Sequence, residues 1–126
     1  MLRVLVYGSL RKGLHNDIHR YQEMTGAEME LKGECEINAE MYSLGAYPFI
    51  HFHNDGKTIG EVYEITSEEE AMLRSLDRLE GYRGEGERNF YDRKEVDTPW
   101  GKAWVYFFSE KYSGASDKTL VKDGDW

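Results

Sequence analysis

The sequence predicts a single α+β domain, built on a small, mostly antiparallel β-barrel or sheet with a few flanking helices. The chain has 126 residues, the size of one ordinary domain, and contains no linker-like segment or internal repeat. Residues 29–37 alternate apolar and charged side chains, which is typical of a strand with one solvated face. The other apolar segments are short and separated by turn signals, and one segment has a clear helical period. We therefore treat residues 1–126 as one mixed domain.

The expected strands follow the apolar segments. The first covers residues 2–7 and ends at Gly8. A short helix is expected to begin at Asn16 or Asp17, which are good capping residues, and to run to about Met24. The later strands are expected as one long strand or a pair over 27–44, and as single strands over 49–52, 59–65, 89–96 and 102–108. The tail from residue 109 is polar and has no clear pattern.

The strongest helical pattern follows Thr66 and Ser67. Either residue can cap the helix, and Glu69 or Glu70 can complete a capping box. Gly81 is expected to end the helix. The expected apolar stripe consists of Met72, Leu73, Leu76 and Leu79.

Composition excludes several classes of protein. The chain carries 24 acidic and 16 basic side chains, and this net charge of −8 argues against general affinity for nucleic acid or for an anionic membrane. The only cysteine, Cys35, has no internal disulfide partner and is expected to be a buried, inert thiol. No apolar run reaches a membrane-spanning length and the N-terminal residues lack the layout of a signal peptide, so we expect a cytoplasmic protein.

The segment from Tyr7 to Leu10 is the first candidate binding element. A strand that stops at a glycine exposes successive backbone N–H groups, which can converge on an anion such as a carboxylate. The segment lacks the spacing of a Walker phosphate-binding loop and of a dinucleotide fingerprint, and a turn without a ligand is the other interpretation. Residues 1–22 carry four basic side chains against one acidic, so this loop lies in the one basic part of the chain.

Glu80 is the second candidate. At about 100° per residue it falls between Leu73 and Leu76 around the predicted helix, within the apolar stripe. It also lies in the last turn, where the helix dipole disfavours a carboxylate. Burial would raise its pKa further, which makes Glu80 a candidate acid or base. The alternatives are a helix end bent toward solvent, or a structural carboxylate paired with Arg83, Arg88 or Arg93.

Metal binding is not expected. His15 and His19 are four residues apart, and His51 and His53 are two apart, so each pair can share a face. Neither pair has a third ligand at an obvious spacing. We therefore expect no cofactor.

Several motifs occur in order along the chain and together resemble the γ-glutamylcyclotransferase-like (AIG2-like) family. They are Tyr7-Gly8-Ser9-Leu10-Arg11-Lys12-Gly13 followed by Asn16, then residues 41–48, 59–65, 76–82, 90–93 and 124–126. The resemblance covers nearly the whole chain. The stretch from Arg83 to Asn89 is longer than a minimal connection in that family, which bears on the shape of the pocket rim.

The resemblance implies a compact α+β fold and an enzyme that needs no cofactor. Its reaction would cyclise a γ-glutamyl group to 5-oxoproline and release the attached amine, with a small molecule as partner and neither nucleic acid nor membrane. Glu80 would be the catalytic acid/base. The substrate-binding residues implied are Tyr7, Gly8, Ser9, Leu10, Tyr91 and Arg93. The other hypothesis is a non-catalytic binding or regulatory protein that keeps the same pocket.

Overall fold

A computed structural model of the chain describes residues 2–11, 13, 17–43, 48–52, 55–85, 87, 89–108, 119–121 and 124. In chain order its elements are β1 (Leu2–Val6), the 3₁₀-helix η1 (Gly8–Leu10), α1 (His19–Thr25), β2 (Met29–Ile37), β3 (Ala39–Ser43), β4 (Pro48–Phe52), β5 (Thr58–Ile65), α2 (Glu69–Glu80), β6 (Tyr91–Thr98), β7 (Gly101–Phe108) and β8 (Thr119–Val121). Asn16, residues 44–47, Asp125 and Trp126, on which part of the sequence argument rests, lie outside the described residues.

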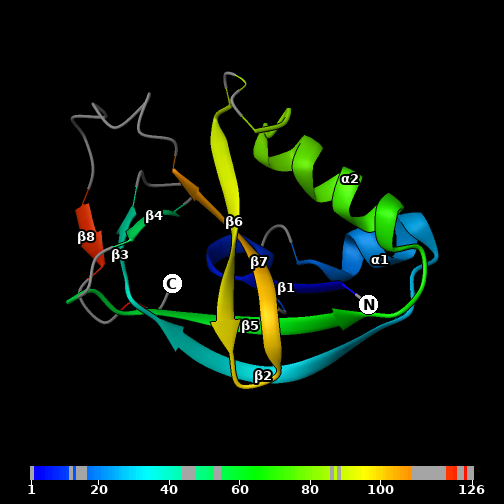
Figure 1. Cartoon of the computed structure of the whole chain (residues 1–126), viewed down its shortest axis with the longest axis horizontal. Coiled ribbons are helices and arrows are strands. Elements are labelled where there is room, and N and C mark those ends of the chain that lie inside the picture. The colour runs from blue at the N-terminus through cyan, green and yellow to red at the C-terminus, as the bar shows by residue number, and fades with distance from the viewer. Residues whose placement is uncertain are drawn as a thin grey trace.

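Two sheets form the framework (Figure 1). The larger has the strand order β2-β5-β1-β7-β6 and the smaller has the order β4-β3-β8. Every described pairing is antiparallel except that of β1 with β7. The expectation of an α+β fold with a mostly antiparallel sheet is confirmed, and of the two forms expected it is the open sheet: β2 and β6 remain as its edges instead of closing a barrel.

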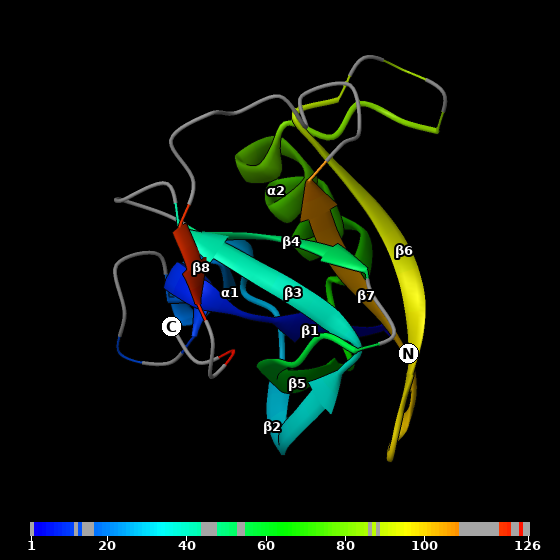
Figure 2. The same cartoon turned by 90° about the vertical axis from the view of Figure 1, so that its left-hand side faces the viewer.

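Strand β1 is covered on both faces. Its successive side chains alternate between two apolar clusters: Val4 and Val6 pack with Met72 and Leu76 of α2, whereas Leu5 packs with side chains that include those of the smaller sheet. Figures 1 and 2 show the two helices on one side of the larger sheet and β3, β4 and β8 on the other. Because both faces are buried, the strand is apolar almost throughout instead of alternating.

The predicted alternation in β2 is wrong at one point. Leu31 was expected on the apolar face but is 42% exposed. The pairing of β2 with β5 shifts register between Leu31 and Gly33, and such a bulge changes which face the side chains occupy. A Cβ atom on Gly33 would lie 2.9 Å from the Trp100 ring, so the glycine lets the indole pack against the bulge.

The predicted start of α2 is also wrong. Its N-cap residue is Glu68, with φ 54°, and no side chain caps the helix. The Ser67 hydroxyl instead accepts a hydrogen bond from the Glu28 backbone N–H at 2.8 Å, so it joins β2 to the β5–α2 connection. The predicted end is confirmed, because Gly81 has φ 67° and terminates the helix.

Two further differences between the predicted and the observed elements lie near the two ends of the chain. Helix α1 begins at His19, slightly later than predicted, and the Asp17 carboxylate accepts a hydrogen bond from the His19 N–H at 3.0 Å. In the tail, where no element was expected, β8 pairs with β3, and the Gly124 carbonyl accepts a hydrogen bond from the Ile59 N–H at 2.8 Å. No helix in the described part of the chain is long and apolar enough to span a bilayer.

Leu76 and Leu79 give a matched test of which residues anchor α2. Leu76 is fully buried, whereas Leu79, expected in the apolar stripe, is 38% exposed. Leu76→Ala should lower the free energy of unfolding by about 2–5 kcal/mol, because it leaves a cavity between the helix and the sheet. Leu79→Ala should change it by only about 0.5 kcal/mol. Urea denaturation of both variants measures this difference, and equal losses would contradict the packing described.

Candidate active site

Glu80 ends α2 with its side chain turned toward the interior. It shares the buried face of the helix with Leu76, and Glu80 itself is only partly exposed. Burial raises the pKa of its carboxyl group from 4.5 to about 7. Among the residues that the structure describes, none forms an ion pair or hydrogen bond with this carboxylate. The expectation that the helical period turns Glu80 inward is therefore confirmed.

Three tyrosines from different elements lie close enough to Glu80 for its charge to act on their hydroxyl groups. They are Tyr7 at the end of β1, Tyr21 of α1 and Tyr106 of β7. Burial is the main cause of the raised pKa of each phenol, and the negative charge of Glu80 raises all three further. The phenols therefore stay protonated around neutral pH, and Glu80 lies in a setting of neutral groups instead of beside a cation.

The segment predicted to bind an anion is a tight 3₁₀ turn. Gly8 has φ 63°, a conformation that favours glycine, and its carbonyl accepts a hydrogen bond from the Arg11 N–H at 3.1 Å. Since a 3₁₀-helix bonds each N–H to the carbonyl three residues earlier, the Leu10 N–H faces the carbonyl of the N-cap residue Tyr7, and the N–H groups of Gly8 and Ser9 have no acceptor within the turn. The Tyr7 hydroxyl donates a hydrogen bond to the Tyr106 carbonyl at 2.7 Å, which fixes the start of this turn.

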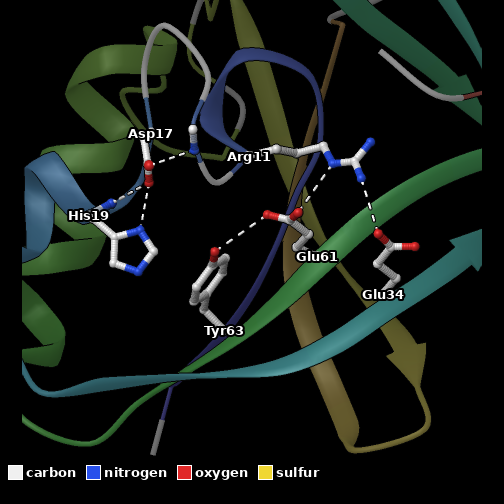
Figure 3. Close-up of polar contacts among 7 residues, drawn as sticks. Arg11, Asp17, His19, Glu34, Glu61 and Tyr63 are labelled. Carbon is white, nitrogen blue, oxygen red and sulfur yellow. Dashed lines mark hydrogen bonds and ion pairs between the residues drawn. The ribbon is translucent and has the colours of Figure 1, made fainter.

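Arg11, at the end of that turn, is already neutralised. Its Nε lies 3.4 Å from an oxygen of Glu61, and its Nη2 lies 3.3 Å from Glu34 (Figure 3). Tyr63 donates its hydroxyl to the other oxygen of Glu61 at 3.4 Å. The positive charge of Arg11 is therefore balanced by carboxylates on β2 and β5.

A second set of contacts closes the loop before α1. The Asp17 carboxylate accepts the Gly13 N–H at 2.7 Å and lies 2.6 Å from Nδ1 of His19 (Figure 3). The His19 ring in turn packs edge-on against Tyr63, with 5.5 Å between centroids. Of the histidine pairs considered for a metal, His15 and His53 lie outside the described residues.

Asp77 is a central residue that the sequence reasoning missed. Its Oδ1 accepts a hydrogen bond from the Tyr106 hydroxyl at 2.6 Å and lies 2.9 Å from Nε of Arg93. The Arg93 guanidinium also stacks between the rings of Tyr82 and Trp104, at 4.6 and 4.4 Å. Arg93 was considered as a partner of Glu80 but pairs with Asp77. The only sequence feature that indicates a role for Asp77 is its position about one helical turn before Glu80.

Tyr91 and Asn89 lie at the start of β6. The Tyr91 side chain is buried in the core and lies close enough to Tyr7 to raise the pKa of the Tyr7 hydroxyl. The fully buried Asn89 folds the preceding loop: its Oδ1 accepts the Arg83 N–H at 2.7 Å, and its Nδ2 donates to the Gly84 carbonyl at 2.8 Å. A lone asparagine in a polar loop gives no signal for this role.

Comparison with known proteins identifies the family of the chain. Residues 4–126 match the family described as "Gamma-glutamyl cyclotransferase, AIG2-like". The chain is 37% identical over 126 residues to the Escherichia coli K12 "Gamma-glutamylcyclotransferase family protein YtfP", covering 99% of this chain and 96% of that protein. The solution structure of E. coli ytfP superposes with a TM-score of 0.67 at 35% identity, over 99% of this chain and 96% of that one.

Two further solved structures share the fold. The crystal structure of protein PH0828 from Pyrococcus horikoshii has a TM-score of 0.70 at 29% identity and covers 99% of this chain and 89% of that one. An AIG2-like protein from Mus musculus has a TM-score of 0.64 at 18% identity, over 100% of this chain and 88% of that one, which shows the fold alone. With the family match over almost its whole length, the chain belongs to the AIG2-like γ-glutamylcyclotransferase family.

Proposed function

We propose that this protein is a γ-glutamylcyclotransferase that converts the γ-glutamyl group of a small amine, amino acid or peptide to 5-oxoproline. The observation that carries the proposal is Glu80, a partly buried carboxylate with a pKa of about 7 and no cationic partner among the described residues. A proton-transfer group works best when its pKa is near the operating pH. Such a carboxylate can therefore both accept and donate a proton at neutral pH.

The reaction is an intramolecular aminolysis. Glu80 takes a proton from the α-ammonium group, and the α-nitrogen then attacks the γ-carbonyl carbon to form the ring N–C bond. The carbonyl oxygen carries the negative charge in the tetrahedral intermediate. Glu80 passes this proton to the outgoing nitrogen and takes a second proton from the ring nitrogen, which is positively charged after the attack. When the oxyanion charge returns to the carbonyl, the bond to the outgoing nitrogen breaks. The released amine takes the second proton from Glu80, which is then a carboxylate again. The nucleophile belongs to the substrate, so the enzyme's tasks are to orient it and to move two protons in succession.

The turn after β1 is proposed to hold the substrate. The backbone N–H groups of Gly8 and Ser9 would bind the α-carboxylate or the developing oxyanion, and Leu10 would complete the turn that presents them. Tyr7 and Tyr91 are both buried, and burial raises the pKa of the Tyr7 phenol so that it stays neutral; the two rings would form the wall of the pocket. We propose that Arg93, although assigned to substrate binding by resemblance, acts by holding Asp77 and through it the Tyr106 hydroxyl.

A panel of γ-glutamyl compounds tests the proposal. We expect 5-oxoproline release from at least one of γ-glutamyl amines, γ-glutamyl amino acids and γ-glutamyl-lysine isopeptide, measured by chromatography. The active compound identifies the leaving group. No release from any of them, together with intact binding of 5-oxoproline, would favour the non-catalytic binding protein. In this proposal the partner is a small solute, and neither nucleic acid nor a membrane takes part. The location is cytoplasmic.

A further inference from the structure

A cavity lies beside the C-terminal end of α2, and Glu80 is not among the described residues that line it. Its volume is about 560 Å³, within the usual range for a small-molecule site. Arg74 and Arg78 line it and project roughly 120° and 160° away from Glu80 around the helix axis. We call this cavity the arginine pocket. Its charged and aromatic lining consists of Arg74, Asp77, Arg78, Tyr82, Arg83 and Arg93.

The charge of the arginine pocket is opposite to that of the chain. Four of the eight arginines in the sequence line it, although the whole chain has a net charge of −8. Among the described residues of the lining, Asp77 is the single acidic side chain and there is no lysine. The guanidinium group differs from an ammonium group in offering a planar fork of donors that matches carboxylate and phosphate oxygens. The lining therefore suits an oxyanion better than a simple monovalent ion.

Most of this positive charge has no partner within the described protein. Arg78 and Arg83 form no ion pair with any described residue, and Arg74 has only Glu70, 4.0 Å away on the exposed helix surface. Arg93 is the exception, since Asp77 and two aromatic rings fix its position. The pocket thus combines one rigid guanidinium, that of Arg93, with two that have no ion pair among the described residues and with Arg74, whose single contact is at the exposed helix surface.

Capping of the helix does not explain the cluster. Arginines near a helix C-terminus often bond to the last backbone carbonyls. Here the Asp77 carbonyl accepts the Tyr82 N–H at 2.8 Å and the Arg78 carbonyl accepts the Gly81 N–H at 3.3 Å. The Gly81 carbonyl in turn accepts the Phe90 N–H at 3.1 Å. Because backbone N–H groups already bond to these carbonyls, bonding to them does not account for the cluster of guanidinium groups.

We propose that the arginine pocket binds a small oxyanion carrying at least two negative charges, a phosphate or a polycarboxylate. Four guanidinium groups around one cavity repel one another, and a ligand with several charges relieves that repulsion more than a single charge does. The size of the cavity limits the ligand to a small molecule. Its separation from Glu80 around the helix makes it a second site, and this proposal does not depend on the reaction proposed above.

Calorimetric titration of the whole chain with inorganic phosphate and with citrate tests the site. We expect saturable binding of at least one probe, weakened by added sodium chloride. The probe that saturates tells a phosphate site from a polycarboxylate site. Absence of saturable binding by either probe would overturn the proposal.

Single variants locate the binding. Arg78→Gln and Arg83→Gln alter exposed side chains, so the fold should be retained, and each should weaken binding by about tenfold or more. Lys102→Gln removes the same charge from an exposed position on β7, away from the pocket, and should change the affinity by less than about twofold. An equal loss in the Lys102 variant would show binding to the net charge alone and overturn the site. Glu80→Gln should leave binding unchanged, which separates this result from loss of turnover.

Discussion

Replacing Glu80 by glutamine is expected to lower kcat by at least about a hundredfold while leaving the fold intact. The amide has nearly the same shape as the carboxyl group, but it can neither take the proton from the α-ammonium group nor return it to the leaving nitrogen. Release of 5-oxoproline from the best compound of the panel measures the loss. Glu70→Gln, a change of the same type on the exposed first turn of α2, should keep wild-type turnover. Wild-type-like turnover in the Glu80 variant would end the assignment.

The same substitution should stabilise the protein at alkaline pH. The pKa of Glu80 is about 7 in the folded chain against 4.5 for an ordinary glutamate, so folding favours its protonated form. Below about pH 4.5 the group is protonated in both states and has no effect on stability. As the pH rises to about 7 the unfolded chain ionises first, and the free energy of unfolding falls by roughly 3 kcal/mol in all.

Glutamine does not ionise, so Glu80→Gln should be more stable than the wild type by up to roughly 3 kcal/mol at pH 8, and about equal at pH 4. Urea denaturation at the two pH values measures this difference. The pH dependence of activity should reflect the same ionisation. The ionised carboxylate is the base, so kcat/KM of the wild type should rise as the pH passes about 7. A stability difference independent of pH would show that Glu80 is solvated.

Gly60→Ala is expected to have a large effect on stability and activity together. Gly60 lies in β5 between β2 and β1, and a Cβ atom there would lie 2.5 Å from Cδ2 of Leu5 and 2.8 Å from the Val6 carbonyl oxygen. The side chain can turn away, but the carbonyl belongs to the strand that leads into Tyr7. We expect a loss of about 3 kcal/mol in the free energy of unfolding, the upper end for overpacking.

Gly26→Ala is the matched control for this change. A Cβ atom on Gly26 would meet nothing within 4 Å, so only its positive φ of 72° resists alanine, with an expected loss of about 1 kcal/mol. Gly26→Ala should also leave turnover unchanged, whereas Gly60→Ala should reduce it by displacing the end of β1. A smaller loss for Gly60→Ala than for Gly26→Ala would contradict the close approach of the two strands.

The sequence predicted those features that depend on local order. The helical period alone placed Leu76 in the core and Glu80 on the same face, and Gly81 marked the end of α2. Leu79 follows the same period yet is partly exposed. The helical period shows which residues share a face of α2, but it does not show how much of that face other elements cover. The exposure of Leu31 has a similar origin, since a bulge depends on the partner strand.

Interactions between distant residues could not be predicted in this way. Nothing in a single sequence indicates that Arg93 pairs with Asp77, or that Arg11 turns to Glu61 on β5. Charge counting placed a basic region around the turn after β1, but the structure neutralises Arg11 locally. A charge census by segment measures composition, whereas the field at a site depends on the ion pairs that the fold makes.

The position of β1 in the larger sheet also determines when the site can form. This strand precedes the other described strands in the chain, yet its neighbours in the sheet are β5 and β7, and the Tyr7 hydroxyl donates a hydrogen bond to a carbonyl 99 residues later. Contacts so distant in sequence form late and slow the folding of a chain. During synthesis on the ribosome, the turn at residues 8–10 therefore cannot be fixed by the Tyr7 hydrogen bond until β7 has been made. Glu80 and the turn come together only once nearly all of the described sheet has been made.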